Sequence, residues 1–170
     1  MMRLNFYKTH EDVTLPKFAT KNSACFDLCF SAAGKTFAEG YNKNNAKFVR
    51  GFVEGHLHIM PGDRLLVPTG LIIDIPKDFS VRLHPRSGLS LKQGLVLANA
   101  EGVIDSDYVE EVFIILTNIS DNGISIKSGD RICQGELVRS EEYIILETKL
   151  KPEQKTDRNG GMGSTGVSND

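Results

Sequence analysis

The run Arg64-Leu-Leu-Val-Pro-Thr-Gly-Leu-Ile-Ile-Asp-Ile75 is the stretch that decides the fold class of this chain. It is mostly apolar and β-branched, and turn residues bound it on both sides, Pro61-Gly62-Asp63 before it and Pro76-Lys77-Asp78 after it. Such side chains suit a pleated, buried surface, whereas Gly, Pro and Asp favour the turns between strands. The run therefore predicts β-structure over residues 64–75.

Short strand-like segments of the same kind recur along the chain. They are Arg3–Tyr7, Ala24–Phe30, Lys47–Val53, Ser80–Leu83, Val112–Asn118 and Tyr143–Leu146. Val, Ile and Thr together supply 33 residues and Ala only 8, which favours strands because β-branched side chains lose rotamer freedom in helices. No stretch keeps a helical apolar period for three turns. The pattern predicts an all-β sandwich, jelly roll or barrel.

Two similar segments mark turns of the same design. Ile59-Met-Pro-Gly-Asp-Arg64 and Ile126-Lys-Ser-Gly-Asp-Arg131 both place Gly-Asp between strand-like residues. Two copies are too few for a repeat architecture. They predict equivalent corners of two hairpins.

The chain divides into a β-rich domain over residues 1–150 and a Gly-rich arm over residues 151–170. Within the domain, the polar stretch at 34–55 is predicted to be an inserted hairpin excursion. The arm is too poor in bulky apolar residues to hold itself in place, so it is either a free end or a segment that orders over a ligand.

Composition excludes several classes of protein. A net charge of −2 argues against nonspecific nucleic-acid binding, and no apolar run approaches the roughly 20 residues that cross a bilayer. The first residues do not resemble a signal peptide. The three cysteines show no CxxC spacing, which indicates a reducing cytoplasm with thiols as small core residues. His56 and His58 lie without a third ligand in sequence and are interpreted as surface histidines.

Three segments could carry chemistry, and each also has an ordinary structural interpretation. Arg158–Gly166 contains GxGxxG without room for a following helix, so it is either a loose end or a loop that wraps a polyanion. In Leu83–Ser90, Ser87 could cap a short helical turn beside Arg86, which would bind an anion or only stabilise a loop. Asn99–Tyr108 offers a general base and a ring that could pack on a flat ligand, or an acidic turn.

In their order along the chain, these segments resemble the motifs of the homotrimeric dUTP pyrophosphatase (dUTPase) family. The other two motifs are Ala24-Cys-Phe-Asp27-Leu and Gly129-Asp-Arg131-Ile-Cys-Gln134. The resemblance spans residues 24–166 apart from the 34–55 excursion. It implies an all-β, jelly-roll-like (β-clip) subunit and a homotrimer with active sites at subunit interfaces. A flexible C-terminal arm would close over each site.

The resemblance also implies the reaction and the residues that perform it. The family hydrolyses dUTP to dUMP and pyrophosphate with Mg²⁺, which limits uracil incorporation into DNA and supplies dUMP for dTMP synthesis. Asp105 would be the general base, and Asp27 would hold Mg²⁺ through water. The substrate-binding residues would be Arg86, Ser87, Gly88 and Gln134 for the phosphates, Asn99, Gly102, Val103, Ile104 and Tyr108 for the nucleoside, and Arg158, Met162, Gly163, Ser164 and Thr165 from the arm.

The chain departs from the family pattern at a few positions. Met162 stands where the family usually has a Phe that stacks on uracil, and the arm is one residue shorter than usual. Val109-Glu110-Glu111 replaces the common Arg-Gly-Glu after Tyr108. Glu101 replaces a usual Pro, and Gly135-Glu136 stands where apolar residues are typical. These last changes suggest altered subunit contacts.

Other functions remain as alternatives. A dCTP deaminase-like enzyme would share the fold, although Asp105-Ser-Asp107-Tyr108 follows the hydrolase pattern. A nucleotide-sensing regulatory module could use arm ordering as a signal, but would not need Asp105. A purely structural jelly roll would explain the strands but not the arm. Zinc-dependent deaminases are excluded because HxE and PCxxC are absent.

Overall fold

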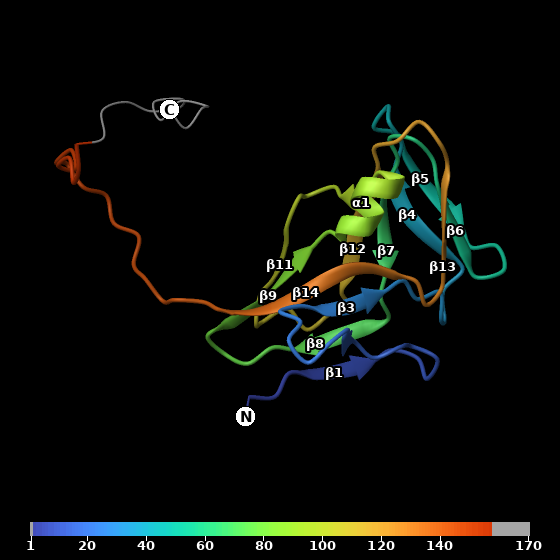
Figure 1. The fold of residues 1–170 in the computed structure, drawn as a ribbon, viewed down its shortest axis with the longest axis horizontal. Coiled ribbons are helices and arrows are strands. Elements are labelled where there is room, and N and C mark those ends of the chain that lie inside the picture. The colour runs from blue at the N-terminus through green and yellow to red at the C-terminus, as the bar shows by residue number, and fades with distance from the viewer. Residues whose placement is uncertain (1, 158–170) are drawn as a thin grey trace.

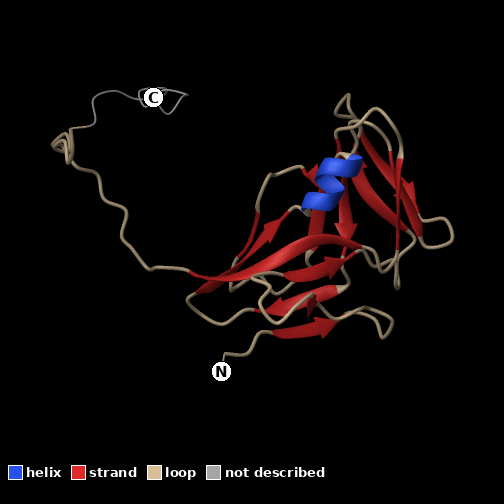
Figure 2. Ribbon diagram, viewed as in Figure 1, coloured by secondary structure: helices blue, strands red, loops and turns tan. Residues whose placement is uncertain are grey.

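The computed structural model describes residues 2–157, which form fourteen strands and one short helix (Figures 1 and 2). The elements are β1 (Asn5–Lys8), β2 (Lys17–Phe18), β3 (Phe26–Cys29), β4 (Phe37–Tyr41), β5 (Lys47–Gly51), β6 (His56–Ile59), β7 (Arg64–Pro68), β8 (Leu71–Asp74), β9 (Phe79–His84), α1 (Ser87–Gln93), β10 (Leu95–Leu97), β11 (Gly102–Ile104), β12 (Phe113–Asn118), β13 (Ile124–Lys127) and β14 (Arg131–Arg139). The prediction of an all-β, jelly-roll-like fold is confirmed.

Two five-stranded sheets hold most of the strands. Their orders are β10-β12-β7-β4-β5 and β11-β9-β14-β3-β2, and two small sheets, β1-β8 and β13-β6, complete the fold. Strands β7 and β12 alternate buried and exposed side chains, so each turns one face inward. Buried residues of both large sheets, such as Leu65, Ile114, Leu28 and Val81, belong to one apolar cluster. A single core therefore holds the sheets together.

The two Gly-Asp turns are equivalent corners, but they do not close hairpins. The first connects β6 to β7 and the second connects β13 to β14; in each case the chain passes from the small β13-β6 sheet into a large one. The Asp63 carboxylate accepts the Met60 amide at 3.2 Å, and the Asp130 carboxylate accepts the Lys127 amide at 2.7 Å. The same side chain thus closes both corners, while the strands on either side pair elsewhere.

The segment at 34–55 forms the hairpin β4–β5, and β4 also pairs with β7 of the large sheet. Gly40 makes this pairing close: a Cβ atom there would lie 2.3 Å from the Arg64 carbonyl oxygen. The hairpin is therefore joined to the main sheet through a position that has no room for a side chain.

We expect Gly40→Ala to lower the free energy of unfolding by about 3 kcal/mol, because the backbone of β7 must move to admit the methyl group. Gly51→Ala is the matched control, since its Cβ would meet nothing closer than the Thr36 carbonyl oxygen at 3.9 Å. Urea unfolding of both variants measures the difference. Equal stability of the two variants would show that β4 does not depend on this close approach.

The sequence prediction of a strand at Tyr143–Leu146 is wrong. These residues form no strand, and their side chains are 78% to 86% exposed. The chain leaves the body after β14 and runs away from it (Figure 1). An apolar run becomes a strand only where another strand offers backbone partners, and this segment has none within residues 2–157 of its own chain.

Candidate active site

One shallow hollow of about 250 Å³ collects six of the predicted site residues. They are Asn99, Gly102, Val103, Ile104, Asp105 and Tyr108. Apolar side chains, among them Leu83, Leu97 and Phe113, form the rest of its wall. We call this group of residues the nucleoside half-site, because the predicted contacts to uracil and deoxyribose lie here together with Asp105, the predicted general base.

The nucleoside half-site is built on the pairing of β11 with β9. Gly102 lies opposite Leu83, and a Cβ at Gly102 would come within 2.9 Å of the Leu83 side chain. Only glycine lets the two strands approach this closely. Asp105 follows the strand in a turn that the Tyr108 amide closes on the Asp105 carbonyl at 3.1 Å. The Asp105 side chain is exposed and therefore open to water and ligand.

Tyr108 is held in place by Glu111. Its hydroxyl donates to the Glu111 carbonyl at 2.8 Å, and the Glu111 carboxylate pairs with Lys35 at 2.7 Å and accepts the Gly70 amide at 2.9 Å. Glu111 had no assigned role in the sequence prediction. Two signals could have pointed to it: its position as the third residue after Tyr108, and its match to the Glu of the common Arg-Gly-Glu pattern there.

The second group of predicted residues surrounds the buried carboxylate of Asp27. Arg131 Nη1 donates to Asp27 Oδ2 at 3.0 Å, and Arg86 Nε lies 3.2 Å from Oδ1. This second pair is close but not aligned as a hydrogen bond, so Oδ1 accepts none within the described chain. Gln134 pairs in register with Asp27 and with His84, which places it beside the carboxylate. We call Asp27, Arg86, Ser87, Gly88 and Gln134 the phosphate half-site.

The helix at the phosphate half-site begins differently from the sequence prediction. Ser87 is its first residue and not its cap; Arg86 takes the cap position in an extended conformation and makes no side-chain cap hydrogen bond. Ser90 donates its hydroxyl to the Arg86 carbonyl at 3.1 Å. Ser87 and Gly88 are exposed, and a Cβ at Gly88 would meet no atom within 4 Å. Both residues are therefore open to a ligand.

Arg131 is a second residue beside the predicted site to which the sequence analysis assigned no role. It lies inside the Gly129–Gln134 motif but was given no part. In the structure it pairs with Asp27 Oδ2, whereas Arg86 lies beside Oδ1, and it lines a hollow of about 270 Å³ together with Arg86 and Asp130. No sequence pattern links residue 131 to residue 27; only the β14–β3 register does.

Within one chain Asp105 and Arg86 stay apart. Ile104 pairs with Val81 near the start of β9, whereas Arg86 lies two residues past the end of β9 at His84. Asp105 follows Ile104 and is therefore level with Ser80 on β9. Arg86 comes six residues after Ser80, and six residues of extended chain span roughly 20 Å. The hollow at Asp105 and the hollow at Arg86 share no residue. A single chain therefore does not bring Asp105, the predicted general base, close to Arg86, a predicted phosphate-binding residue.

The predicted arm residues lie outside the described residues. These are Arg158, Met162, Gly163, Ser164 and Thr165.

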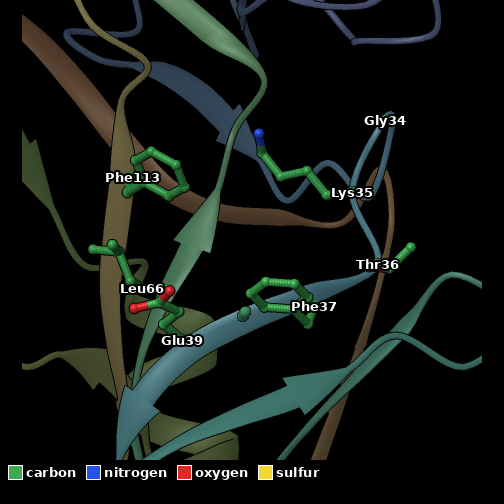
Figure 3. Close-up of a pocket in the computed structure, with 8 residues that line it drawn as sticks. Gly34, Lys35, Thr36, Phe37, Glu39, Leu66 and Phe113 are labelled. Carbon is green, nitrogen blue, oxygen red and sulfur yellow. The ribbon is translucent and has the colours of Figure 1, made fainter.

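A larger hollow of about 510 Å³ contains none of the predicted site residues. Figure 3 shows it between the start of β4 and β12, with Lys35 and Phe37 on one side and Leu66 and Phe113 on the other. Lys35 Nζ lies 5.7 Å from the centre of the Phe113 ring. This hollow touches the nucleoside half-site only through Phe113.

The three cysteines are free, as expected. Burial raises the pKa of the Cys133 thiol to about 12, so Cys133 is an inert core residue. Partial burial, and then the negative charges of Glu136 and Asp27, raise the pKa of Cys25.

His56 and His58 belong to no group of three metal-ligand side chains among residues 2–157. No helix in that range has the length and apolar character to span a membrane.

Known proteins with similar sequences are dUTP hydrolases. The chain is 38% identical to the deoxyuridine 5'-triphosphate nucleotidohydrolase of Finegoldia magna over 153 residues, which is 89% of this chain and 91% of that protein. The enzyme of the same name from Wolbachia pipientis wMel is 39% identical over 157 residues, covering 92% and 89% of the two chains.

Solved structures of dUTPases share the fold of this chain. The dUTPase of Staphylococcus bacteriophage 80alpha with dUPNHPP superposes with a TM-score of 0.76 at 20% identity, over 98% of this chain and all of that one. A mutant dUTPase from phage phi11 of S. aureus, described with a structural Mg(II) ion, has a TM-score of 0.67 at 19% identity and covers 88% and 98%.

The dUTPase family profile matches residues 53–166, which include four of the five motifs. The dCTP deaminase and the purely structural jelly roll are therefore set aside. The chain belongs to the dUTPase family and is an enzyme that hydrolyses dUTP.

Proposed function

We propose that this chain hydrolyses dUTP at sites shared between neighbouring copies in a homotrimer. The observation that carries the proposal is the separation of Asp105, level with the start of β9, from Arg86, which lies beyond the end of β9. Each half-site is incomplete alone, because one offers a base and a nucleoside slot and the other offers cationic phosphate ligands. A neighbouring copy that places its phosphate half-site against the nucleoside half-site would complete both.

The nucleoside half-site would select uracil and deoxyribose. Asn99 and the backbone of residues 102–104 would pair with the uracil edge, and cytosine would leave its 4-amino group opposite mismatched partners. Tyr108, fixed by its hydrogen bond to the Glu111 carbonyl, would pack under the sugar and leave no room for a 2'-hydroxyl. Selectivity would thus follow from polar groups whose hydrogen bonds only the correct nucleoside completes.

Asp105 would act as the general base. Its exposed carboxylate can hold a water and take a proton from it as the oxygen attacks the α-phosphorus. The bond from the α-phosphorus to the bridging oxygen breaks, and pyrophosphate leaves with that oxygen. The products are dUMP and pyrophosphate, and the proton passes from Asp105 to solvent.

The phosphate half-site would neutralise the triphosphate, which otherwise repels the attacking water. Arg86 would exchange its unaligned contact with Asp27 for two parallel hydrogen bonds to phosphate oxygens. Ser87 and Gly88, open to solvent, would add a hydroxyl and backbone amides, and Gln134 would contact the α-phosphate. Arg131 would keep Asp27 paired when Arg86 turns away.

Asp27 fits an outer-sphere contact to Mg²⁺. Mg²⁺ keeps several waters and is usually held by one or two carboxylates and substrate phosphates. Asp27 supplies one carboxylate beside the predicted phosphate-binding residues. Its Oδ1 accepts no hydrogen bond within the described chain and so still has free acceptor capacity. The residue that would hold the ion, through water, is Asp27. When bound, Mg²⁺ would supply positive charge to the triphosphate.

The arm would complete the site. Arg158, Ser164 and Thr165 would grip the terminal phosphates, while Met162 and Gly163 would cover the base. Its closure would exclude water other than the reacting one. We place the enzyme in the cytoplasm; the three free cysteines support this.

Mixed trimers test the shared site. Arg86→Ala and Asp105→Asn are co-expressed with different affinity tags, and trimers that contain both chains are isolated with both tags. Each single variant should be nearly inactive. In a closed ring of three, every mixed trimer has one interface with both intact half-sites, so pyrophosphate release from dUTP should recover to about one third of the original rate.

The control is Asp105→Asn co-expressed with itself under the two tags, which should remain inactive. Mixed trimers without recovered activity would contradict the shared site, as would a fully active monomer at high dilution.

A further inference from the structure

Three metal-ligating side chains come together beside the phosphate half-site. The ligand atoms of Cys25, His84 and Glu136 all lie within 4.8 Å of one another. All three residues are half-buried, so solvent and small ions can reach them. They form the sole group of this kind among residues 2–157, and none of them has a part in dUTP hydrolysis as described above.

The sheet register explains why residues so distant in sequence meet. Strand β14 lies between β9 and β3, with Gln134 paired to both His84 and Asp27. Paired residues, and residues two apart on one strand, share a face of the sheet. Cys25 is two residues before Asp27 and Glu136 is two residues after Gln134. The side chains of His84 on β9, Glu136 on β14 and Cys25, the residue just before β3, are therefore placed on the same face.

The spacing suits a tetrahedral ion. His84 Nε2 lies 3.4 Å from Glu136 Oε2. Ligand bonds of roughly 2.1 Å in a tetrahedron separate a nitrogen and an oxygen by about 3.4 Å. The distance between these two atoms thus already matches a bound ion, and the Cys25 thiol lies within 4.8 Å of both.

A second carboxylate lies near the other nitrogen of the imidazole. Glu101 Oε1 lies 3.7 Å from His84 Nδ1, on the other side of the ring from Glu136, and Glu101 Oε2 lies 3.5 Å from Arg82 Nη1. A carboxylate near the second ring nitrogen is typical of metal-bound histidines, because it keeps the proton on that nitrogen and leaves the other free for the metal. Glu101 and Glu136 are also two of the positions where this chain departs from the family pattern.

We propose that Cys25, His84 and Glu136 bind one Zn²⁺ per chain, with Glu101 orienting the histidine. Thiolate, imidazole and carboxylate are the ligands that zinc prefers, whereas Mg²⁺ prefers oxygen alone. The thiolate and the carboxylate balance the charge of the ion. Three protein ligands leave one tetrahedral position for a water or an exchangeable anion, and Gln134 lies between His84 and Asp27 in the sheet register.

Metal titration of the full-length chain without nucleotide tests the site. We expect one Zn²⁺ per chain in competition with a chromogenic chelator, in excess Mg²⁺. Co²⁺ in its place should give a thiolate-to-cobalt charge-transfer band and the strong visible bands of tetrahedral cobalt. Cys25→Ser should abolish the charge-transfer band, and Glu136→Gln should weaken Zn²⁺ binding at least tenfold. Glu101→Gln should weaken it about 10- to 100-fold.

Cys29→Ser is the matched control, because Cys29 is also half-buried on β3 but outside the cluster. It should keep both the stoichiometry and the cobalt spectrum. Thermal unfolding without metal verifies that each variant is folded. Zinc binding that survives Cys25→Ser and Glu136→Gln, binding lost equally in Cys29→Ser, or no binding at all would overturn the proposal. None of these results depends on dUTP turnover, so they leave the shared active site untouched.

Discussion

We expect Asp105→Asn to lower kcat for dUTP hydrolysis by about 10²- to 10⁴-fold, the range that a positioned general base contributes. The amide has the same shape as the carboxylate but cannot accept the proton of the attacking water. Binding of a non-hydrolysable dUTP analogue should remain close to that of the unchanged chain, because the uracil slot and the phosphate ligands are intact. Steady-state pyrophosphate release and analogue titration measure the two quantities separately.

Asp107→Asn is the control for charge. Asp107 is exposed and two residues away, and it does not line the nucleoside half-site. Its replacement removes the same negative charge from the same loop and should leave kcat unchanged. If both variants lose activity equally, loop charge and not a base explains the effect; if Asp105→Asn turns over normally, the assignment of the base is wrong.

Truncation after Lys155 should lower kcat/KM for dUTP about 100-fold or more while the fold stays intact. The loss follows from the removal of Arg158, Ser164 and Thr165, since hydrogen bonds to charged groups contribute about 1.5–3 kcal/mol each. The fold should survive because residues 140–157 contribute no buried side chain to the core. Pyrophosphate release and thermal unfolding, measured on the same preparation, separate the two effects.

Truncation after Val167 is the matched control. It leaves the Arg158–Gly166 motif whole and removes only Ser168, Asn169 and Asp170. Full activity is expected of it. Unchanged turnover in the shorter chain would show that the motif has no part in catalysis. A comparable loss in the longer chain would assign the effect to the last three residues instead of the motif.

The sequence predicted those parts of the structure that depend on local chemistry. The run at 64–75 does form strands, β7 and β8, and the stretch at 34–55 does form a hairpin. Tyr143–Leu146 has the same apolar character, yet no neighbouring strand pairs with it. Local composition indicates that a segment can form a strand, but whether it does depends on a neighbouring strand that the rest of the fold must provide.

In the candidate site, too, contacts between residues close in sequence could be predicted, whereas contacts across the sheet could not. Asp105 and Tyr108 lie in one hollow, as their closeness in sequence suggested. The contact of Arg131 with Asp27 and the grouping of Cys25, His84 and Glu136 depend on the register of β14 with its two neighbours. Register follows from the whole sheet and cannot be read from a single segment.

The length of β9 has a consequence for inheritance. Since the opposite ends of this strand serve different catalytic centres in the proposed ring, one chain damaged at both ends disables two centres out of three. A defective allele expressed beside a normal one would therefore interfere dominantly, and the loss of activity in the cell would exceed the fraction of faulty copies.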